Sequence, residues 1–247
     1  MNRRHLLQTL AATSAVLSGA GCATGSSIPD GLAEGRQSAW RLDGAAGFAR
    51  LWLWLPPGYA QRREPWPLLV FLHGSGERGE DLQRVKVYGP PRLADEGGAQ
   101  LPCILASPQL EEGARWAPAR LHALLEALKS RLRVDPDRVS ATGLSLGGHG
   151  VWDWACAHPQ DLAAIAPVCG YGNPRAVAAM REVPVRAYHG DRDTVVPLAR
   201  QQACVDALRA AGGQATLTVF PGVGHDAWTP AYQDPQLLPW LLAQVRR

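Results

Sequence analysis

The chain has 247 residues, of which 46% are hydrophobic and 19% charged, and this composition excludes a disordered or fibrous protein. Its length fits a single α/β domain. The formal net charge is +3, and Arg3 and Arg4 at the extreme N-terminus contribute two of these charges. Because the remainder is nearly neutral, a nucleic-acid partner has no electrostatic support.

Residues 1–21 have the pattern of an export signal. The basic pair Arg3-Arg4 precedes an uncharged, mildly apolar run at residues 6–20, and small residues follow. The arginine pair resembles part of a twin-arginine signal, and an ordinary Sec signal fits equally well. We therefore expect an exported protein that resides in the periplasm or cell envelope, or is secreted.

Cys22 follows Gly19-Ala20-Gly21, and this segment resembles the lipobox of bacterial lipoproteins, although Gly19 stands where that pattern prefers leucine. The alternative is cleavage after a small residue near Ala20 or Ala23. A lipid on Cys22 would attach the protein to a membrane without spanning it. Residues 22–36 are predicted to be a linker, and residues 37–247 the catalytic domain.

Four cysteines lie beyond Cys22, namely Cys103, Cys156, Cys169 and Cys204. In an oxidising compartment they could pair in three ways. Their apolar neighbours favour buried free thiols instead, because a free cysteine behaves as a small hydrophobic residue. No C-x-x-C spacing occurs, so the sequence predicts no metal site, and nothing in it calls for a cofactor.

Strand and helix patterns alternate along the rest of the chain. In chain order we predict strands at 50–55, 67–72 and 103–107, a helix at 121–132, a strand at 138–142, a helix directly after Ser145, a strand at 163–168, a short helix at 176–180, a strand at 183–188, a helix at 198–211, a strand at 216–220 and a last helix at 237–245. Continuous apolar strands separated by helices predict a mostly parallel sheet covered on both faces. In such a sheet, functional residues lie at the carboxyl ends of the strands.

Residues 143–147 form a G-x-S-x-G motif between a predicted strand and a predicted helix. The glycines allow a sharp turn in which backbones come close together. Such a turn presents the hydroxyl of Ser145 at a helix N-terminus, where a developing negative charge is favoured. A glycine-rich phosphate-binding turn is the alternative interpretation. The flanking elements favour Ser145 as a nucleophile.

A serine hydroxyl needs an adjacent base, and the chain order Ser…Asp…His is the one this strand-turn-helix arrangement uses. Of the seven histidines, only His225, which follows the last strand, fits that order. The acid should follow the strand at 183–188, where Asp191 and Asp193 are both candidates.

An oxyanion hole needs two backbone N–H groups. We expect one from Leu146, the residue after the nucleophile, and one from the glycine-rich loop at 73–79, with Ser75 preferred over Gly76. Trp116 and Tyr171 follow predicted strands and are candidate substrate-binding residues. Trp152 and Trp154, on the helix after Ser145, are expected in the core.

With these residues in place, the chain resembles the α/β-hydrolase superfamily. Residues 71–81 are similar to a bacterial group of predicted peptidases related to polyhydroxybutyrate depolymerases, feruloyl esterases and carboxylesterases. The resemblance implies an α/β-hydrolase fold without a large cap domain. The family pattern H-G-x-x-D-x-x-V-P, matched at residues 189–197, implies Asp193 as the acid and leaves Asp191 as a turn residue.

The resemblance further implies a serine esterase that cleaves carboxylic esters through an acyl-enzyme intermediate, with a small-molecule or polymer-derived ester as substrate. A peptidase or amide hydrolase of the same fold is the alternative. It would need carboxylates that bind a free amino group, and Glu77 is the one residue that hints at them. A non-catalytic binding lipoprotein is a third alternative, although such a protein has no need of Ser145, Asp193 and His225 together.

Overall fold

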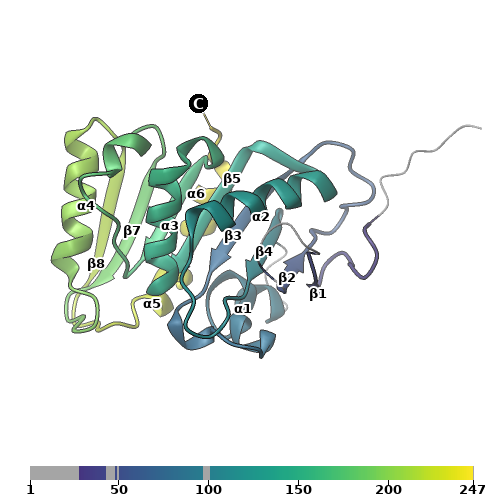
Figure 1. Ribbon diagram of the computed structural model, residues 1–247, viewed down its shortest axis with the longest axis horizontal. Helices are drawn as coiled ribbons and strands as arrows, with labels where there is room; N and C mark the ends of the chain where they lie inside the picture. The colour runs from purple at the N-terminus through teal and green to yellow at the C-terminus, as the bar shows by residue number, and fades with distance from the viewer. Residues whose placement is uncertain (1–27, 43–47, 49, 97–100, 247) are drawn as a thin grey trace, which may run out of the picture.

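The computed structural model describes residues 28–42, 48, 50–96 and 101–246, and the predicted export signal and lipidation site lie outside these residues. Eight strands form one sheet in the order β1-β2-β4-β3-β5-β6-β7-β8. β1 and β2 pair with their neighbours antiparallel, and the strands from β4 to β8 in this order pair in parallel. Helices cover both faces of the sheet (Figure 1).

The predicted strands and the four longer predicted helices are present, with ends shifted by a few residues, and β1, α1 and α5 are further elements that were not predicted. The strands are β1 (Gln37–Trp40), β2 (Leu51–Trp54), β3 (Trp66–Leu72), β4 (Ile104–Pro108), β5 (Val134–Leu144), β6 (Ala164–Val168), β7 (Val185–Gly190) and β8 (Ala215–Phe220). The α-helices are α1 (Gly89–Asp95), α2 (Pro118–Arg131), α3 (Leu146–Ala157), α4 (Leu198–Ala210), α5 (Trp228–Gln233) and α6 (Leu237–Ala243). The short 3-10 helices are η1 (Ser75–Glu77), η2 (Leu82–Lys86), η3 (Pro159–Asp161) and η4 (Val177–Met180), the last where a short helix was expected.

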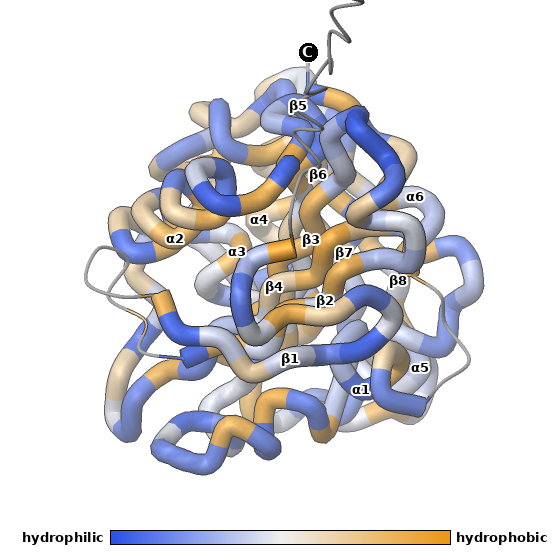
Figure 2. The backbone as a smooth tube through the Cα atoms, turned by 90° about the vertical axis from the view of Figure 1, so that its right-hand side faces the viewer, coloured by the Kyte–Doolittle hydropathy of each residue, from blue (hydrophilic) through white to orange (hydrophobic). Residues whose placement is uncertain are grey.

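The core lies in two layers, one on each face of the sheet. One layer packs α2, α3 and α4 against the sheet and contains Trp152 and Trp154, both fully buried as expected. The other layer packs α1, α5 and α6 on the opposite face. Every residue of β3, β4 and β6 is buried, because both faces are covered. The apolar strands accordingly run through the centre of the molecule in Figure 2.

Part of the predicted linker packs on the domain. Ile28 and Leu32 contact the core layer of α2 to α4, and the carboxylate of Glu34 accepts hydrogen bonds from the N–H groups of Gly58 and Ala60. The chain from residue 28 to 36 therefore packs on the domain edge beside β2.

The cysteines and the hydropathy of the helices can be examined in the described residues. Cys103, Cys156, Cys169 and Cys204 are free thiols, three of them buried, as their apolar neighbours indicated. No helix among residues 28–42, 50–96 and 101–246 is long and apolar enough to cross a membrane.

Candidate active site

The turn between β5 and α3 holds Ser145 in a strained backbone conformation, with φ 52° and ψ −115°. A non-glycine residue with positive φ is uncommon, and such strain is found at functional sites. The Ser145 N–H donates to the carbonyl of Val168 at the end of β6, 3.0 Å away. A side chain on Gly147 would place its Cβ 1.9 Å from the carbonyl oxygen of Leu72. Only glycine permits α3 to begin this close to β3.

His225 and Asp193 lie beside this turn, at the ends of β8 and β7. His225 Nε2 is 2.9 Å from Ser145 Oγ, and His225 Nδ1 is 2.8 Å from Asp193 Oδ2. The His225 side chain is 20% exposed and that of Asp193 is 0% exposed. The three side chains therefore form one continuous hydrogen-bonded chain that opens to solvent on the serine side.

The Asp193 carboxylate is held by more than His225. Its Oδ1 accepts hydrogen bonds from the N–H groups of Val195 and Val196, at 2.8 and 2.9 Å. Burial alone would raise the pKa of this carboxyl, but the hydrogen bonds from His225 and the two backbone N–H groups outweigh it and hold the pKa below its ordinary value. The fully buried His189 ring lies under it, with Nε2 3.2 Å from Asp193 Oδ2.

The neighbouring carboxylates have structural partners. Asp191 Oδ1 accepts from the N–H of Gly222 at 2.7 Å and so joins the turn after β7 to the turn after β8. Asp226 Oδ1 accepts from the N–H and hydroxyl of Thr229, at 3.1 and 2.8 Å, in the first turn of α5. Neither is hydrogen-bonded to His225, so Asp193 is the carboxylate that orients this ring.

The loop after β3 carries Ser75, the first residue of η1, and lies beside the start of α3. At Gly74 an added Cβ would lie 2.8 Å from the Leu144 side chain, so this loop packs directly on the end of β5. Leu146 is the first residue of α3, and an N–H in that position has no partner within its own helix. The backbone N–H groups of Leu146 and Ser75 thus belong to two segments that meet next to Ser145.

The buried side chain of His73 holds the start of the loop after β3 in place. Its Nδ1 is 2.6 Å from the carbonyl oxygen of Gly74, and its Nε2 accepts from the N–H of Leu110 at 3.0 Å. Burial lowers the pKa of His73 to about 4, so the ring is neutral at pH 7 and donates through Nδ1 while it accepts through Nε2. The loop geometry therefore rests on a neutral imidazole.

Trp116 lies in the core and not at an open pocket wall, where it was expected. Its side chain is 4% exposed, its ring packs on His73 with centroids 4.9 Å apart, and its Nε1–H donates to the carbonyl of His73 at 3.1 Å. Its Cβ is also only 2.5 Å from the position of a Cβ added to Gly150 of α3. The indole is buried because α3 approaches it so closely, and its contacts with His73 hold the loop after β3 in place.

Tyr171 lies at the active-site end of the sheet, two residues after Cys169, and is half-buried. Its hydroxyl accepts from Arg200 at 2.7 Å, and its ring packs edge-on against His149 at 4.4 Å between centroids. The Tyr171 N–H donates to His149 Nδ1 at 3.0 Å, which fixes the loop after β6 against the first turn of α3.

Sequence reasoning missed an aromatic pocket beside His225. The ring of Trp228 meets His225 edge-on at 5.3 Å between centroids, and the ring of Tyr88 packs on Trp228 at 5.5 Å. Trp228 and Tyr88, but not His225, line a pocket of about 430 Å³, open solvent included, between α1 and α5, together with Tyr232 and Arg92. The one sequence signal for it is the aromatic residue three positions after His225.

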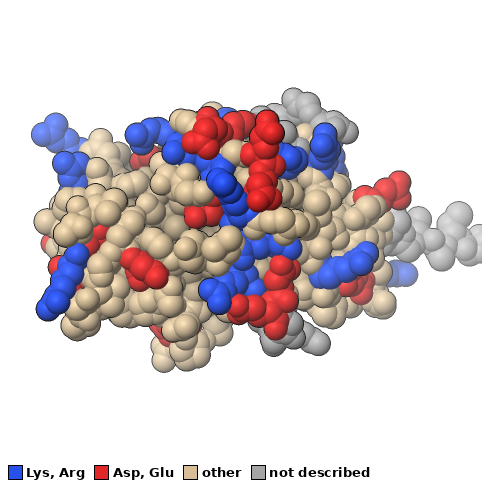
Figure 3. Space-filling view, turned by 90° about the horizontal axis from the view of Figure 1, so that it is seen from below, with Lys and Arg blue, Asp and Glu red and all other residues tan. Residues whose placement is uncertain are grey.

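The charged surface at this end of the molecule is mixed. Figure 3 views the side toward which the parallel strands β3 to β8 of Figure 1 point, and Lys and Arg side chains stand there among Asp and Glu, most densely near the centre of the view. A surface of both signs gives no strong attraction for a highly charged ligand.

Metal binding at this site has little chemical support. One ligand atom each from Cys169, Asp193 and His225 lies within 4.8 Å of the others. Burial raises the pKa of the Cys169 thiol to about 12, so it is neutral at pH 7, whereas the thiolate is the metal ligand. The carboxylate and the imidazole of this set are hydrogen-bonded to each other and to Ser145.

The architecture is that of the α/β-hydrolase superfamily: a mostly parallel eight-stranded sheet with helices on both faces and a serine at the strand-turn-helix after β5. The described residues form no separate cap domain. A solved thermostable esterase has the same fold, with a TM-score of 0.70 and 25% identity over 85% of this chain and 63% of its own. The predicted fold class is thereby confirmed.

The dienelactone hydrolase family matches residues 107–234, more than half of the chain, and the protein belongs to this family. NocK of Nocardia uniformis subsp. tsuyamanensis, whose name marks it as a presumed esterase, is 30% identical over 67% of this chain and 48% of its own length. Feruloyl esterase D of Neurospora crassa is 28% identical over 94% of this chain and 81% of its own. The chain spans about half the length of several of these curated relatives.

Proposed function

We propose that this protein hydrolyses carboxylic esters with a Ser145-His225-Asp193 triad. One observation carries the proposal: Ser145 Oγ, on a strained turn at a helix N-terminus, lies 2.9 Å from a histidine that a buried carboxylate orients from 2.8 Å. A binding protein would gain nothing from storing strain at this turn or from an activated serine hydroxyl. Esterase names among the relatives of the chain support the same reaction.

In the first step Ser145 Oγ attacks the ester carbonyl carbon while His225 Nε2 takes the hydroxyl proton. The carbonyl oxygen becomes an oxyanion, which the N–H groups of Leu146 and Ser75 stabilise together with the N-terminus of α3. The intermediate collapses, the alcohol leaves with the proton from His225, and the acyl group stays on Ser145. Water then gives its proton to His225, attacks the acyl-enzyme and releases the acid, and the proton returns to Ser145.

The substrate class that the site favours is an ester with a planar aromatic group. The pocket beside His225 is lined by Tyr88, Trp228 and Tyr232, and aromatic rings prefer offset or edge-to-face contacts with another ring. The similarity to a feruloyl esterase along 94% of this chain points in the same direction. Esters of this kind occur as small molecules and as parts of polymers, and an uncapped site accepts both.

Amide hydrolysis is the second candidate, and one observation favours it. Glu77 Oε2 is buried and has no hydrogen-bond partner among the described residues, and burial raises the pKa of this carboxyl above its ordinary value. A free amino group on a substrate would supply the missing donor. Glu77→Gln should then abolish hydrolysis of aminoacyl amides and leave ester hydrolysis unchanged.

The test is a substrate panel on the protein after removal of residues 1–21: short acyl esters, feruloyl esters, a polyester and aminoacyl amides. We expect turnover of esters that disappears in Ser145→Ala, and covalent labelling of Ser145 by a fluorophosphonate. Trp228→Ala should raise KM for feruloyl esters about fivefold and leave acetyl esters unaffected, since losing one aromatic contact costs about 1 kcal/mol. Absence of labelling in the wild-type protein would remove the enzyme proposal altogether.

We also propose that the chain is exported and attached to a membrane through a lipid on Cys22, on the strength of the basic start, the apolar run and the lipobox-like segment. Fractionation of cells that express the full chain tests this. Wild-type protein should be found with membranes and Cys22→Ser in the soluble exported fraction. Recovery of both variants from the cytoplasm would contradict the export signal.

A further inference from the structure

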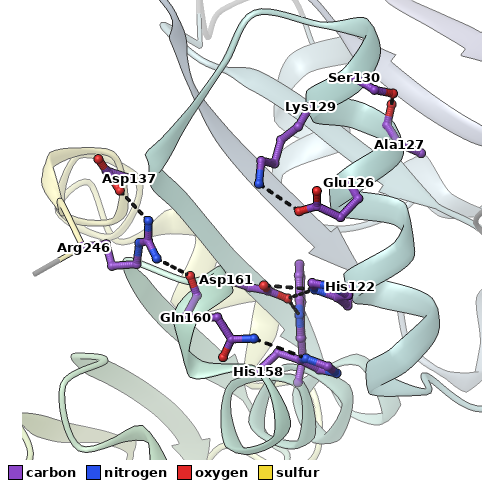
Figure 4. Close-up of polar contacts among 11 residues, drawn as sticks. His122, Glu126, Ala127, Lys129, Ser130, Asp137, His158, Gln160, Asp161 and Arg246 are labelled. Atoms are coloured by element: carbon purple, nitrogen blue, oxygen red, sulfur yellow. Dashed lines mark hydrogen bonds and ion pairs between the residues drawn. The ribbon is translucent and has the colours of Figure 1, made fainter.

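Two histidines and a buried aspartate meet at the far end of α3 from Ser145, outside the proposed ester site. His122 lies on α2, His158 directly follows α3, and Asp161 is the last residue of η3 (Figure 4). His122 Nδ1 is 2.9 Å from Asp161 Oδ2, and the two imidazole rings are stacked at 4.6 Å between centroids. One ligand atom from each residue lies within 4.8 Å of the others.

We propose that His122, His158 and Asp161 form a site for a divalent transition-metal ion of the zinc type. Two imidazoles and one carboxylate are a common ligand set for this ion in proteins, with water or another ligand in the fourth position. Imidazole nitrogen also excludes the hard ions Mg²⁺ and Ca²⁺ as preferred occupants, because these prefer oxygen ligands. The partly exposed histidines leave room on the solvent side for the fourth ligand.

The charge of Asp161 is the second observation that points to a cation. Its side chain is 5% exposed, and no lysine or arginine pairs with it in the described part of the chain. The nearby Arg246 binds Asp137 at 2.6 Å and the carbonyl of Gln160 at 2.8 Å instead. Its partners are the N–H groups of His122 and Trp154, so this buried carboxylate lacks a permanent positive charge beside it, and a metal ion would supply one.

The surroundings of Asp161 resemble the support that metal ligands receive. The Trp154 Nε1–H donates to Asp161 Oδ2 at 2.8 Å from the buried face of α3. Ligating carboxylates are usually hydrogen-bonded in this way, which fixes their orientation. The cluster also lies at the C-terminal end of α3, where the helix dipole favours positive charge.

Two adjustments accompany binding. The proton that His122 donates to Asp161 moves from Nδ1 to Nε2, so that the lone pair of Nδ1 becomes available to the metal. The two rings lie within 6° of parallel, and their lone pairs, which lie in the ring planes, cannot converge on one ion from a stack. The partly exposed His158 ring therefore turns. Ligands around tetrahedral zinc are about 3.4 Å apart, so the approach from 4.8 Å requires shifts of about 1 Å.

The ion would join α2 to the segment after α3 and stabilise the fold, without contact with the ester site. α3 has 12 residues, so its two ends are about 18 Å apart. Removal of the metal is therefore expected to lower the melting temperature of the protein while Ser145 remains reactive toward a fluorophosphonate.

The experiment is a zinc titration of the chelator-treated full chain by calorimetry, with melting temperatures recorded with and without zinc. We expect one equivalent bound at this site and a higher melting temperature with zinc. Loss of an outer partner alone costs about 10- to 100-fold in metal affinity, so His158→Ala, which removes a direct ligand, should cost about 100-fold or more. His122→Gln, which keeps the bulk of the side chain, should have the same effect.

Ser130→Ala is the matched control, since Ser130 is an exposed residue of α2 whose hydroxyl donates to the carbonyl of Ala127, and this variant should bind zinc like the wild type. His225→Ala removes the other cluster that could take zinc and should leave the stabilisation intact. Equal zinc affinity in wild type, His158→Ala and His122→Gln would overturn the proposal, as would a wild-type chain that binds no zinc. Loss of stabilisation in His225→Ala alone would assign the ion to the ester site instead.

Discussion

Asp193→Asn is the substitution that tests the proposed triad most directly, because the structure fixes how the new amide must lie. The two N–H groups of Val195 and Val196 point at Oδ1 from 2.8 and 2.9 Å. An asparagine oxygen can accept both bonds, whereas its NH₂ group in that position would face two donors. The oxygen therefore stays at the Oδ1 position, and the NH₂ group takes the place of Oδ2, 2.8 Å from His225 Nδ1.

This orientation forces the wrong tautomer on His225. Nδ1 must now accept from the amide, so the ring proton sits on Nε2 and points at Ser145 Oγ, which lies 2.9 Å away. A protonated Nε2 cannot take the serine proton, and the carboxylate that stabilised the imidazolium is gone. The same change in other serine hydrolases lowers kcat by about 10⁴-fold, which corresponds to about 5 kcal/mol of transition-state stabilisation.

The matched control is Asp191→Asn, two residues away in the same turn. Its exposed Oδ1 accepts only from the N–H of Gly222, a bond that asparagine can also accept, so kcat should stay within about twofold. The assay is kcat on a short p-nitrophenyl ester, with near-ultraviolet circular dichroism as a check on the fold. If Asp191→Asn loses more rate than Asp193→Asn, or if Asp193→Asn keeps a tenth of the wild-type kcat, the assignment of the acid is wrong.

Two further predictions concern the loop and the turn around Ser145. Gly147→Ala would place a Cβ 1.9 Å from the Leu72 carbonyl oxygen, so it should lower the free energy of unfolding by more than about 3 kcal/mol and abolish activity. Gly76→Ala is the control, because a Cβ added there has no neighbouring atom within 4 Å, and its urea unfolding should match that of the wild type. The pKa of His73 is about 4 in the folded protein, against an ordinary value of 6.5. As the pH falls below 6.5, the unfolded chain therefore binds a proton at His73 before the folded protein does. This difference lowers the free energy of unfolding by about 3 kcal/mol between pH 6.5 and pH 4. His73→Gln should be less stable at pH 8 and should lack this part of the pH slope; an unchanged slope would refute the argument.

The strands from β2 to β8 and the position of the nucleophile were predictable because each depends on local pattern, whereas the short, only partly buried β1 was not predicted. A strand buried on both faces must be apolar throughout, and the turn at Ser145 needs glycine on both sides of the serine. α1 was missed for an equally local reason. It begins with Gly89-Pro90-Pro91, which has no helical spacing of apolar residues, although proline fits the first turn of a helix, where its missing N–H costs nothing.

Side-chain surroundings that combine distant segments were not predictable. Tyr88 and Trp228 line one pocket from helices 140 positions apart in the chain, and no spacing rule relates them. Trp116 follows a strand that ends at the active-site side, and the sequence does not say whether its ring faces the site or the core. The structure turns it inward because Gly150 leaves room for the indole against α3. The His122, His158 and Asp161 cluster likewise depends on contact between α2 and the end of α3.

One element connects the two proposed sites, and its electrostatics explain why each lies where it does. The α3 dipole is equivalent to about half a positive charge at the N-terminus and half a negative charge at the C-terminus, and its effect falls off within one turn. An oxyanion forms on Ser145 at the first end, and the proposed cation binds beside His158 at the other. Because the ends are about 18 Å apart, the metal changes the field at Ser145 little in water, where two charges at that distance are screened. Stability and catalysis should therefore respond separately, with zinc shifting the melting temperature and Asp193→Asn shifting kcat.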